Sequence, residues 1–251
     1  MKLRDKVVII TGGGSGIGAA SCYAFAREGA QVAVANRTLA KAEAVARQIE
    51  SEGGRAISIG ADVSLGADVQ HMIDTTVAEL GLPDIVFNNA GISPSGRVTD
   101  ISEADWDECL NIDLKSVFLT ARCVIPLMIE AGGGVILNTA GTFGIRAAKN
   151  KAAYSVAKAG VINLTRSIAL DYARDNIRCN VICPGYVDTP LNEGFPPTAR
   201  DAFLERYQPL HGLIGAGDVA EMAVYLASDA ARMITGQVFV IDGGQQAGLY
   251  A

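Results

Sequence analysis

The stretch VVIITGGGSGIG occupies residues 7–18, and a helical pattern follows it over residues 19–27. A short apolar run that ends in glycines and opens a helix predicts a strand, a tight turn and a helix. Glycines in such a turn let backbone N–H groups approach a pyrophosphate, and the helix N-terminus favours its negative charge. A tight connection is the plainer interpretation, but the position after the first strand favours dinucleotide binding.

The same alternation of elements continues along the chain. Runs rich in valine and isoleucine predict strands near residues 6–10, 31–35, 56–61, 84–88, 134–140, 177–183 and 236–241. Helical patterns lie between them, near residues 16–29, 39–51, 66–80, 103–130, 152–174 and 217–228. Such alternation is typical of βαβ units around a parallel sheet that is buried on both faces. With 251 residues and no linker-like segment, we expect one α/β domain over residues 1–251.

The segment 190–212 lacks clear periodicity. Prolines at 190, 196, 197 and 209 interrupt any long element, while the aromatic residues Phe195, Phe203 and Tyr207 are available for packing. A long segment of this kind is a candidate lid over a substrate.

Composition excludes several classes of protein. Hydrophobic residues make up 49% of the chain and charged residues 19%, which is compatible with a large core and not with disorder. The net charge is −6 and the basic residues are scattered, so neither nucleic acid nor an anionic membrane is an expected partner. The apolar run at 7–10 is too short for a signal peptide or a membrane span, and a cytoplasmic protein is expected.

The cysteines do not form a metal-binding pattern. None of the five belongs to a CxxC pair, and the chain has only two histidines, so we expect no metal site. Reduced, mostly buried thiols are the expectation.

Tyr154 and Lys158 lie four residues apart in a helical pattern, and therefore on one face. A free tyrosine titrates near pKa ~10, and an adjacent cation favours the phenolate. Lys158 is therefore expected to lower the pKa of Tyr154 and to make it an acid or base near neutral pH. An ordinary solvated helix face is the plainer interpretation of this pair alone.

Several motifs occur together in a fixed order. They are Gly12-x3-Gly16-x-Gly18, Asn88-Asn89-Ala90-Gly91, Asn111, Tyr154-x3-Lys158, Pro184-Gly185 and Asp242-Gly243-Gly244. In combination they closely resemble the classical short-chain dehydrogenase/reductase family over essentially the whole chain.

This resemblance implies a fold and an activity. The expected fold is a Rossmann sheet of seven parallel strands in the order 3-2-1-4-5-6-7, with helices on both faces. The expected activity is NAD(P)-dependent interconversion of a small-molecule alcohol and a ketone or aldehyde. Relatives usually form homotetramers through the long helices near 103–130 and 152–174 and the C-terminal segment.

The resemblance also implies roles for individual residues. Tyr154 matches the catalytic acid/base, Lys158 its partner on the nicotinamide ribose, and Asn111 the residue that supports a water relay. Asn111 could instead satisfy a bend in the long helix. The implied coenzyme-binding set is Gly12, Ser15, Gly16, Ile17, Gly18, Asn36, Arg37, Asp62, Val63, Asn89, Ala90, Gly91, Tyr154, Lys158, Pro184, Gly185, Val187 and Thr189.

Within that set, Asp62 and Val63 match the segment beside the adenine, and Thr189 matches the hydroxyl that holds the carboxamide. Asp62 could also cap the end of a strand. Asn89 matches the wall beside the adenine ribose, and together with Asn88 it could equally brace the central strands.

The chain departs from the family pattern at residue 141. The family normally places a serine thirteen residues before the catalytic tyrosine, where it hydrogen-bonds the substrate oxygen, and this chain has Gly141 there. Loss of one such donor typically costs about 10²–10³ in rate. Three explanations are open: Thr142 supplies the hydroxyl, Tyr154 works with a water, or the chain is impaired. The first two are favoured.

The end of the second predicted strand bears on coenzyme preference. Asn36 lacks the carboxylate that accepts a ribose 2′-OH and repels a 2′-phosphate, while Arg37 offers a planar fork for phosphate. NADP(H) is therefore favoured over NAD(H). Against this, Ser15 stands where NADP-preferring relatives often carry a second basic residue.

Two other functions stay open. Gly141 suits a regulatory or scaffolding protein that binds dinucleotide without chemistry, although the intact Asn111, Tyr154 and Lys158 argue against it. The chain could also reduce 3-oxoacyl groups on a carrier protein, but an acidic chain offers no clear basic docking patch. Phe143, Asn150, Tyr186 and the 190–212 segment are expected to flank the substrate.

Overall fold

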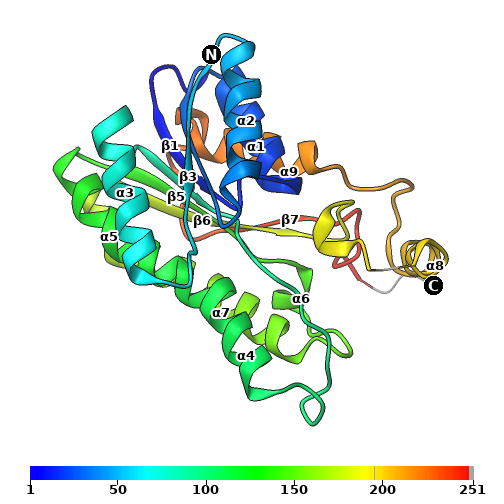
Figure 1. The fold of residues 1–251 in the computed structure, drawn as a ribbon. Coiled ribbons are helices and arrows are strands. Elements are labelled where there is room, and N and C mark those ends of the chain that lie inside the picture. Colours follow the sequence, from blue (N-terminus) through cyan, green and yellow to red (C-terminus); the bar gives the residue numbers. More distant parts are fainter. Residues whose placement is uncertain (195, 249–251) are drawn as a thin grey trace.

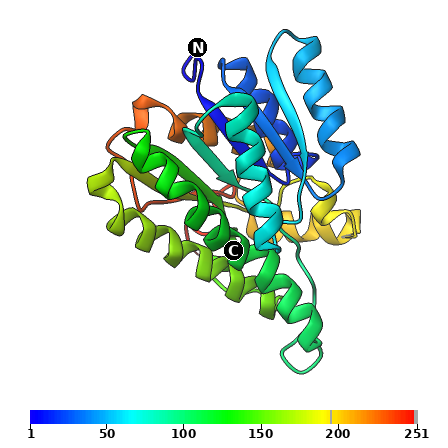
Figure 2. The same ribbon diagram turned by 60° about the vertical axis from the view of Figure 1, so that its left-hand side comes forward.

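The computed structural model describes residues 1–194 and 196–248, which form a single parallel sheet with helices on both faces (Figures 1 and 2). Within these residues the sheet has seven strands in the order β3-β2-β1-β4-β5-β6-β7, so the expected Rossmann topology is confirmed. The strands are β1 (Val7–Thr11), β2 (Gln31–Asn36), β3 (Arg55–Gly60), β4 (Ile85–Asn88), β5 (Gly134–Thr139), β6 (Ile177–Pro184) and β7 (Val238–Ile241).

Helices connect the strands. The long ones are α1 (Gly16–Arg27), α2 (Leu39–Ser51), α3 (Gly66–Leu80), α4 (Glu103–Leu110), α5 (Ser116–Glu130), α7 (Ala152–Asp171), α8 (Pro197–Tyr207) and α9 (Ala216–Ala227). Shorter turns are α6 (Thr142–Ile145), the π-helical turn η1 (Asn111–Lys115), and the 3-10 turns η2 (Ala173–Asp175), η3 (Pro190–Asn192) and η4 (Asp229–Ala231).

Side-chain alternation along the strands creates two cores. Val8 and Ile10 of β1 belong to the core beneath α1, α2 and α9, whereas Val7 and Ile9 belong to the core beneath α3, α5 and α7. Successive side chains of a strand point to opposite faces, so a strand that is apolar throughout must be covered twice. Figure 1 shows these two helical layers on either side of the sheet.

Two segments differ from the sequence prediction. The helix expected over 103–130 is interrupted by the π turn at Asn111–Lys115, where an extra residue per turn changes which side chains face the sheet. The segment 190–212, expected to be irregular, contains α8, which starts at Pro197, where a missing N–H is tolerated. Phe195 lies outside the described residues. Helix α8 lies outside both helical layers (Figure 1).

All five cysteines have free thiols, and four of them are buried, as expected. Among the described residues, no helix combines the length and apolar character needed to cross a membrane.

Candidate active site

The turn after β1 adopts a conformation that requires glycine at specific positions. Gly12 and Gly16 have φ values of 65° and 52°, a region that side chains with a Cβ rarely adopt. A Cβ at Gly12 would lie 3.0 Å from the Ala90 Cα, and one at Gly16 would lie 3.1 Å from the Thr189 side chain. The turn therefore forms a cradle of bare backbone at the start of α1, which fits a pyrophosphate.

The cradle opens into one large cavity of about 1300 Å³ at the carboxyl ends of the strands. Such a crevice is where open α/β sheets bind their ligands. Nearly all of the predicted site residues line it: Gly12, Ser15, Gly16, Ile17, Asn36, Arg37, Asp62, Val63, Asn89, Ala90, Gly91, Thr142, Tyr154, Lys158, Pro184, Gly185, Val187 and Thr189. The exceptions are Gly18 and Asn111.

Gly18 is needed for packing and does not line the cavity. A Cβ at this position would come within 2.1 Å of the Gly12 carbonyl oxygen, so only glycine lets α1 approach the turn. Gly18 therefore has at least a supporting role in the turn, and its direct contact with the coenzyme stays a prediction.

Buried amides fix the strand ends that carry the site. Asn88 donates to the Asn138 side chain at 2.9 Å, and Asn138 donates to Thr165 at 2.9 Å. Asn89 donates through its backbone N–H to the Thr11 hydroxyl at 3.0 Å. The bracing interpretation of Asn88 and Asn89 is thus confirmed, and Asn89 also lines the cavity.

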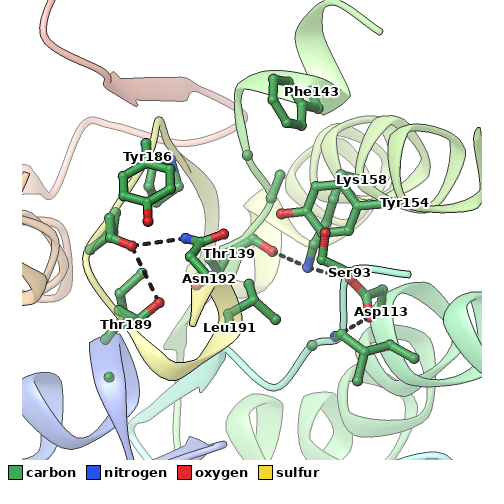
Figure 3. A pocket seen from close by; sticks show the side chains of 18 of the residues that line it. Ser93, Asp113, Thr139, Phe143, Tyr154, Lys158, Tyr186, Thr189, Leu191 and Asn192 are labelled. Atoms are coloured by element: carbon green, nitrogen blue, oxygen red, sulfur yellow. Dashed lines mark hydrogen bonds and ion pairs between the residues drawn. The ribbon is translucent and has the colours of Figure 1, made fainter. Parts of the chain in front are cut away.

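Tyr154 and Lys158 face the cavity from the first turns of α7 (Figure 3). The Lys158 ammonium lies 5.7 Å from the centre of the Tyr154 ring and donates to the Thr139 carbonyl oxygen at 3.0 Å. It also lies 3.1 Å from the Asp113 carboxylate, and these two side chains are only 4% and 0% exposed. The other oxygen of Asp113 accepts from the Ile92 N–H at 2.8 Å.

Asn111 lies at the bend of the helix, as the alternative interpretation expected, and its part in a water relay stays a prediction. It opens the π turn but does not line the cavity, whereas Ile112 and Asp113 do. The π turn shifts the helical register, so that the residue beside Lys158 is Asp113. A prediction that assumes a regular helix cannot anticipate this shift. Asp113 was therefore not predicted as a site residue.

The electrostatics around Tyr154 differ from the expectation. Burial raises the pKa of the phenol, Lys158 lowers it, Asp113 raises it again, and the net direction is upward. Burial lowers the pKa of the Lys158 ammonium, but Asp113 and Tyr154 more than compensate, so this pKa is raised. Lys158 therefore stays charged and still lowers the pKa of the phenol, while Asp113, whose own pKa is raised by burial, opposes part of that effect.

The position of the missing serine faces Tyr154. A Cβ at Gly141 would lie 3.0 Å from the Tyr154 hydroxyl oxygen. The neighbouring Thr142 is 3% exposed and lines the cavity, and no hydrogen bond of its hydroxyl is found among the described residues. A free hydroxyl next to Gly141 is thus available to a substrate.

The end of the cavity beside β2, where the adenosine of the coenzyme is expected, carries two cations. Arg37 lines it directly after β2, and Lys41, in the first turn of α2, lines it as well. Asn36 donates to the Thr38 carbonyl oxygen at 3.0 Å, so its side chain holds the loop after β2.

Ser64 holds the pKa of the Asp62 carboxyl below its usual range through hydrogen bonds of 2.7 Å and 3.0 Å. Lys41 was not singled out from the sequence.

The opposite end is built from aromatic and polar side chains. Phe143 packs edge-on against the Tyr154 ring at 6.5 Å between centroids, and Tyr186, Leu191 and Asn192 face them across the cavity (Figure 3). Asn192 donates to the Val187 carbonyl oxygen at 2.8 Å and so fixes the start of the 190–212 segment. Phe143, Asn150 and Tyr186, expected to flank the substrate, all line this cavity.

Comparison with known proteins agrees with this geometry. The sequence model of the family described as Enoyl-(Acyl carrier protein) reductase matches residues 12–246. A short-chain type dehydrogenase/reductase from Mycobacterium marinum superposes with a TM-score of 0.93 at 35% identity, covering 98% of both chains. The chain belongs to the short-chain dehydrogenase/reductase family.

Two curated relatives of this family are similar over almost their full lengths. The 3-oxoacyl-(acyl-carrier-protein) reductase of Thermotoga maritima is 35% identical over 97% of this chain and 99% of its own. The cis-4-hydroxycyclohexanecarboxylate dehydrogenase of Sinomonas cyclohexanicum is 38% identical over 97% of both chains. As a member of this family, the chain is an NAD(P)-dependent oxidoreductase that acts on CH–OH and C=O groups.

Proposed function

We propose that this protein is an NADP(H)-dependent oxidoreductase of a small-molecule ketone or aldehyde and the corresponding alcohol, with Tyr154 as the acid/base. The observation that carries the proposal is that Tyr154 and the buried Lys158 share one cavity with the glycine cradle. The proposed dinucleotide lies with its pyrophosphate on the turn at 12–18 and its adenosine beside Asp62 and Val63. A bound nicotinamide coenzyme supplies the hydride for reduction and accepts it in the reverse oxidation.

The chain's own residues handle the proton. Tyr154 donates its phenolic proton to the oxygen of the substrate as the carbonyl becomes an alcohol, and it takes that proton back in the oxidation. Lys158 orients the site through its contacts with Thr139 and Asp113 and limits the rise in the pKa of the phenol. Thr142 donates the hydrogen bond to the substrate oxygen that Gly141 cannot. Thr189 binds the carboxamide of the nicotinamide.

The preference for NADP(H) rests on the adenosine end. Arg37 and Lys41 both line the cavity there, and Asn36 places no negative charge against a 2′-phosphate. Two cations around a dianionic phosphate give charge-assisted hydrogen bonds that a ribose hydroxyl cannot match.

The test is NADPH oxidation over a panel of ketones, aldehydes and oxoacyl thioesters, with Tyr154→Phe as the matched variant. We expect turnover of at least one class of carbonyl and a loss of about 10²–10⁴ in kcat for Tyr154→Phe. Coenzyme fluorescence should show that the variant still binds NADPH. NADPH binding without turnover of any carbonyl would instead support the regulatory function that Gly141 suggests.

A second candidate substrate is a 3-oxoacyl group on a carrier protein. The similarity to the Thermotoga maritima reductase favours it, as do the exposed cations Arg146, Lys149 and Arg206 at the cavity. Turnover of an acetoacetyl carrier-protein thioester well above that of every small ketone would establish this candidate.

The proposed assembly is a homotetramer in the cytoplasm. Exposed apolar side chains on α5 and α7, among them Phe118, Val156 and Leu170, offer surface for such an interface. Five free thiols suit a reducing compartment. Sedimentation equilibrium should give four times the mass of the chain, and a monomer at micromolar concentration would contradict the tetramer.

A further inference from the structure

The charge around the cavity is opposite to that of the whole protein. Among the described residues, seven cationic side chains line it and only two carboxylates do, although the net charge of the chain is −6. The cations are Arg37, Lys41, Arg146, Lys149, Lys151, Lys158 and Arg206, and the carboxylates are Asp62 and Asp113. A cleft lined by one sign of charge concentrates ligands of the other sign.

The cations at the coenzyme-binding end and the ion pair of Lys158 with Asp113 account for only part of this excess of positive charge. Arg37 and Lys41 follow β2 at the adenosine end, where Asp62 also lies, and Asp113 is paired with Lys158. The remaining cations lie on the segments beside Tyr154 and on α8. Among the described residues that line the cavity, the only carboxylate on this side is Asp113, which is already paired with Lys158.

Lys151 is the cation closest in sequence to Tyr154, just before α7 begins. Its ammonium donates to the carbonyl oxygen and to the hydroxyl of Ser93, both at 2.8 Å. Ser93 follows Ile92, whose N–H binds Asp113, and Figure 3 places Ser93 on the same side of the cavity as Tyr154 and Lys158. The ammonium is therefore anchored in the wall that carries the proposed acid/base.

The charge of Lys151 is not balanced by the protein. Both of its acceptors are neutral, and no ion pair in the described part of the chain includes it, unlike Lys158 with its Asp113. Lys151 is half-buried, and burial lowers its pKa. An ammonium has three donors, so one of them remains for a ligand. An anionic ligand would offset the free-energy cost of partly desolvating this charge.

The other cations form a more exposed rim. Arg146, Lys149 and Arg206 are all exposed, and the Arg206 guanidinium stacks on the Tyr207 ring at 5.4 Å. Charges in this position are screened by salt, but they attract an anionic ligand to the cavity and raise its association rate.

Resting on the proposed alcohol/carbonyl chemistry, we infer that the natural substrate is an organic oxo acid or hydroxy acid whose carboxylate binds Lys151 while its reacting carbon faces Tyr154. The reaction conserves the acid group: the carbonyl gains a hydride from the coenzyme and a proton from Tyr154, and the carboxylate stays unchanged. Arg146, Lys149 and Arg206 guide this anion into the cavity.

The first test compares oxo acids with their own primary amides, which keep the shape and remove the charge. The pairs are acetoacetate with acetoacetamide, levulinate with levulinamide, and 4-oxocyclohexanecarboxylate with its amide. We expect kcat/KM of at least one acid to exceed that of its amide by tenfold or more, because a charge-assisted hydrogen bond to Lys151 contributes about that factor. Lys151→Met should bring the acid-to-amide ratio of kcat/KM close to one, and unchanged NADPH binding, measured by coenzyme fluorescence, reports an intact fold.

Lys149→Met is the matched control because it removes the same charge from the rim. It should leave the acid-to-amide ratio within about twofold in high salt, where rim charges are screened. An acid advantage that survives Lys151→Met, or neutral amides and thioesters reduced as well as every acid, would overturn the inference and leave the reductase proposal standing.

A binding measurement separates the two proposals further. Valerate and valeramide have no carbonyl to reduce, and calorimetric titration of each into the NADP⁺ complex needs no turnover. We expect valerate to bind at least tenfold more tightly than valeramide, and this difference to vanish in Lys151→Met. Equal binding of the acid and the amide would overturn the anion site, whereas valerate binding without turnover of any carbonyl would keep the site and refute the proposed chemistry.

Discussion

The carboxylate of Asp113 lies 3.1 Å from the ammonium of Lys158, and both side chains are almost completely buried. A lysine next to a tyrosine ordinarily stabilises the phenolate, but a carboxylate on the far side of that lysine acts in the opposite direction. The pKa of Tyr154 is raised, first by burial and then in part by Asp113. Tyr154 is therefore held as a phenol near neutral pH, which suits proton donation to a carbonyl.

Replacing Asp113 with asparagine should shift the pH dependence of alcohol oxidation. Oxidation needs Tyr154 in its phenolate form, so its rate rises with pH through the pKa of that group. Without the Asp113 charge, Lys158 lowers this pKa more effectively, and the rising limb moves to lower pH. Initial rates of alcohol oxidation between neutral and alkaline pH will show the shift.

The same variant should be less stable. The substituted asparagine would keep an acceptor for the Ile92 N–H but would leave the buried Lys158 charge without a carboxylate, with only the neutral Thr139 carbonyl oxygen as partner. Removal of one member of a buried pair costs about 3 kcal/mol or more, which urea unfolding can measure. Asp100→Asn is the control, because Asp100 pairs with Arg97 on the surface and should affect neither property. An unchanged pH profile in Asp113→Asn would refute the role given to the pair.

Substitutions at Gly141 separate the effect of bulk from that of a hydroxyl. A Cβ at this position would lie 3.0 Å from the Tyr154 hydroxyl, so any side chain requires that ring to move by a few tenths of an ångström. The backbone of Gly141, with φ 168°, is extended and accepts any residue. Gly141→Ala adds only the bulk and should slow turnover, while Gly141→Ser adds a donor that offsets part of that loss.

Rates for wild type, Gly141→Ala and Gly141→Ser on one ketone will test this order. We expect the alanine variant to be slower than the serine variant by about tenfold, which is less than the factor of about 10²–10³ typical of one donor to a developing oxyanion, because Thr142 already donates in the proposed site. Turnover found only in the serine variant would mean that the natural chain has lost its chemistry at this position.

The fold could be predicted from the sequence because the patterns that indicate its strands and helices are local and repeated. The predicted runs of five to seven residues match all seven strands to within two residues at each end, and α2 and α3 begin and end where the helical pattern does. The strand order followed only from the resemblance, since periodicity does not specify which strands pair. The turn α6 and helix α8 were missed because neither has a buried face with a readable period.

Site residues could be predicted from the sequence where they lie on a regular element or at the end of a strand. Tyr154 and Lys158 lie on one face of α7, as their spacing predicted. Asp113 could not be predicted in this way, because the spacing of a regular helix does not anticipate the π turn at 111–115 that holds it beside Lys158. Lys41 and Lys151 were missed as well, since only the tertiary structure brings them to the cavity.

Thr142→Val should slow turnover at least tenfold and leave coenzyme affinity nearly unchanged. The Thr142 hydroxyl is buried at the cavity wall next to Gly141, and valine keeps its shape while removing the donor. Thr120→Val is the matched control, because Thr120 is buried in α5 and donates only to the Ser116 carbonyl oxygen. If both variants turn over at the wild-type rate, Thr142 does not supply the missing hydroxyl.

Arg37→Ala and Lys41→Ala should each weaken NADPH binding selectively. Each removes one cation from the adenosine end, and a lost charge-assisted contact with a phosphate corresponds to about tenfold in affinity. NADH lacks the 2′-phosphate, so its affinity should hardly change. Arg47→Ala is the control, since Arg47 lies on α2 together with Lys41, pairs with Glu43 and does not line this cavity. Fluorescence titrations with both coenzymes will measure the ratio, and equal losses for NADPH and NADH would show that Arg37 and Lys41 do not read the phosphate.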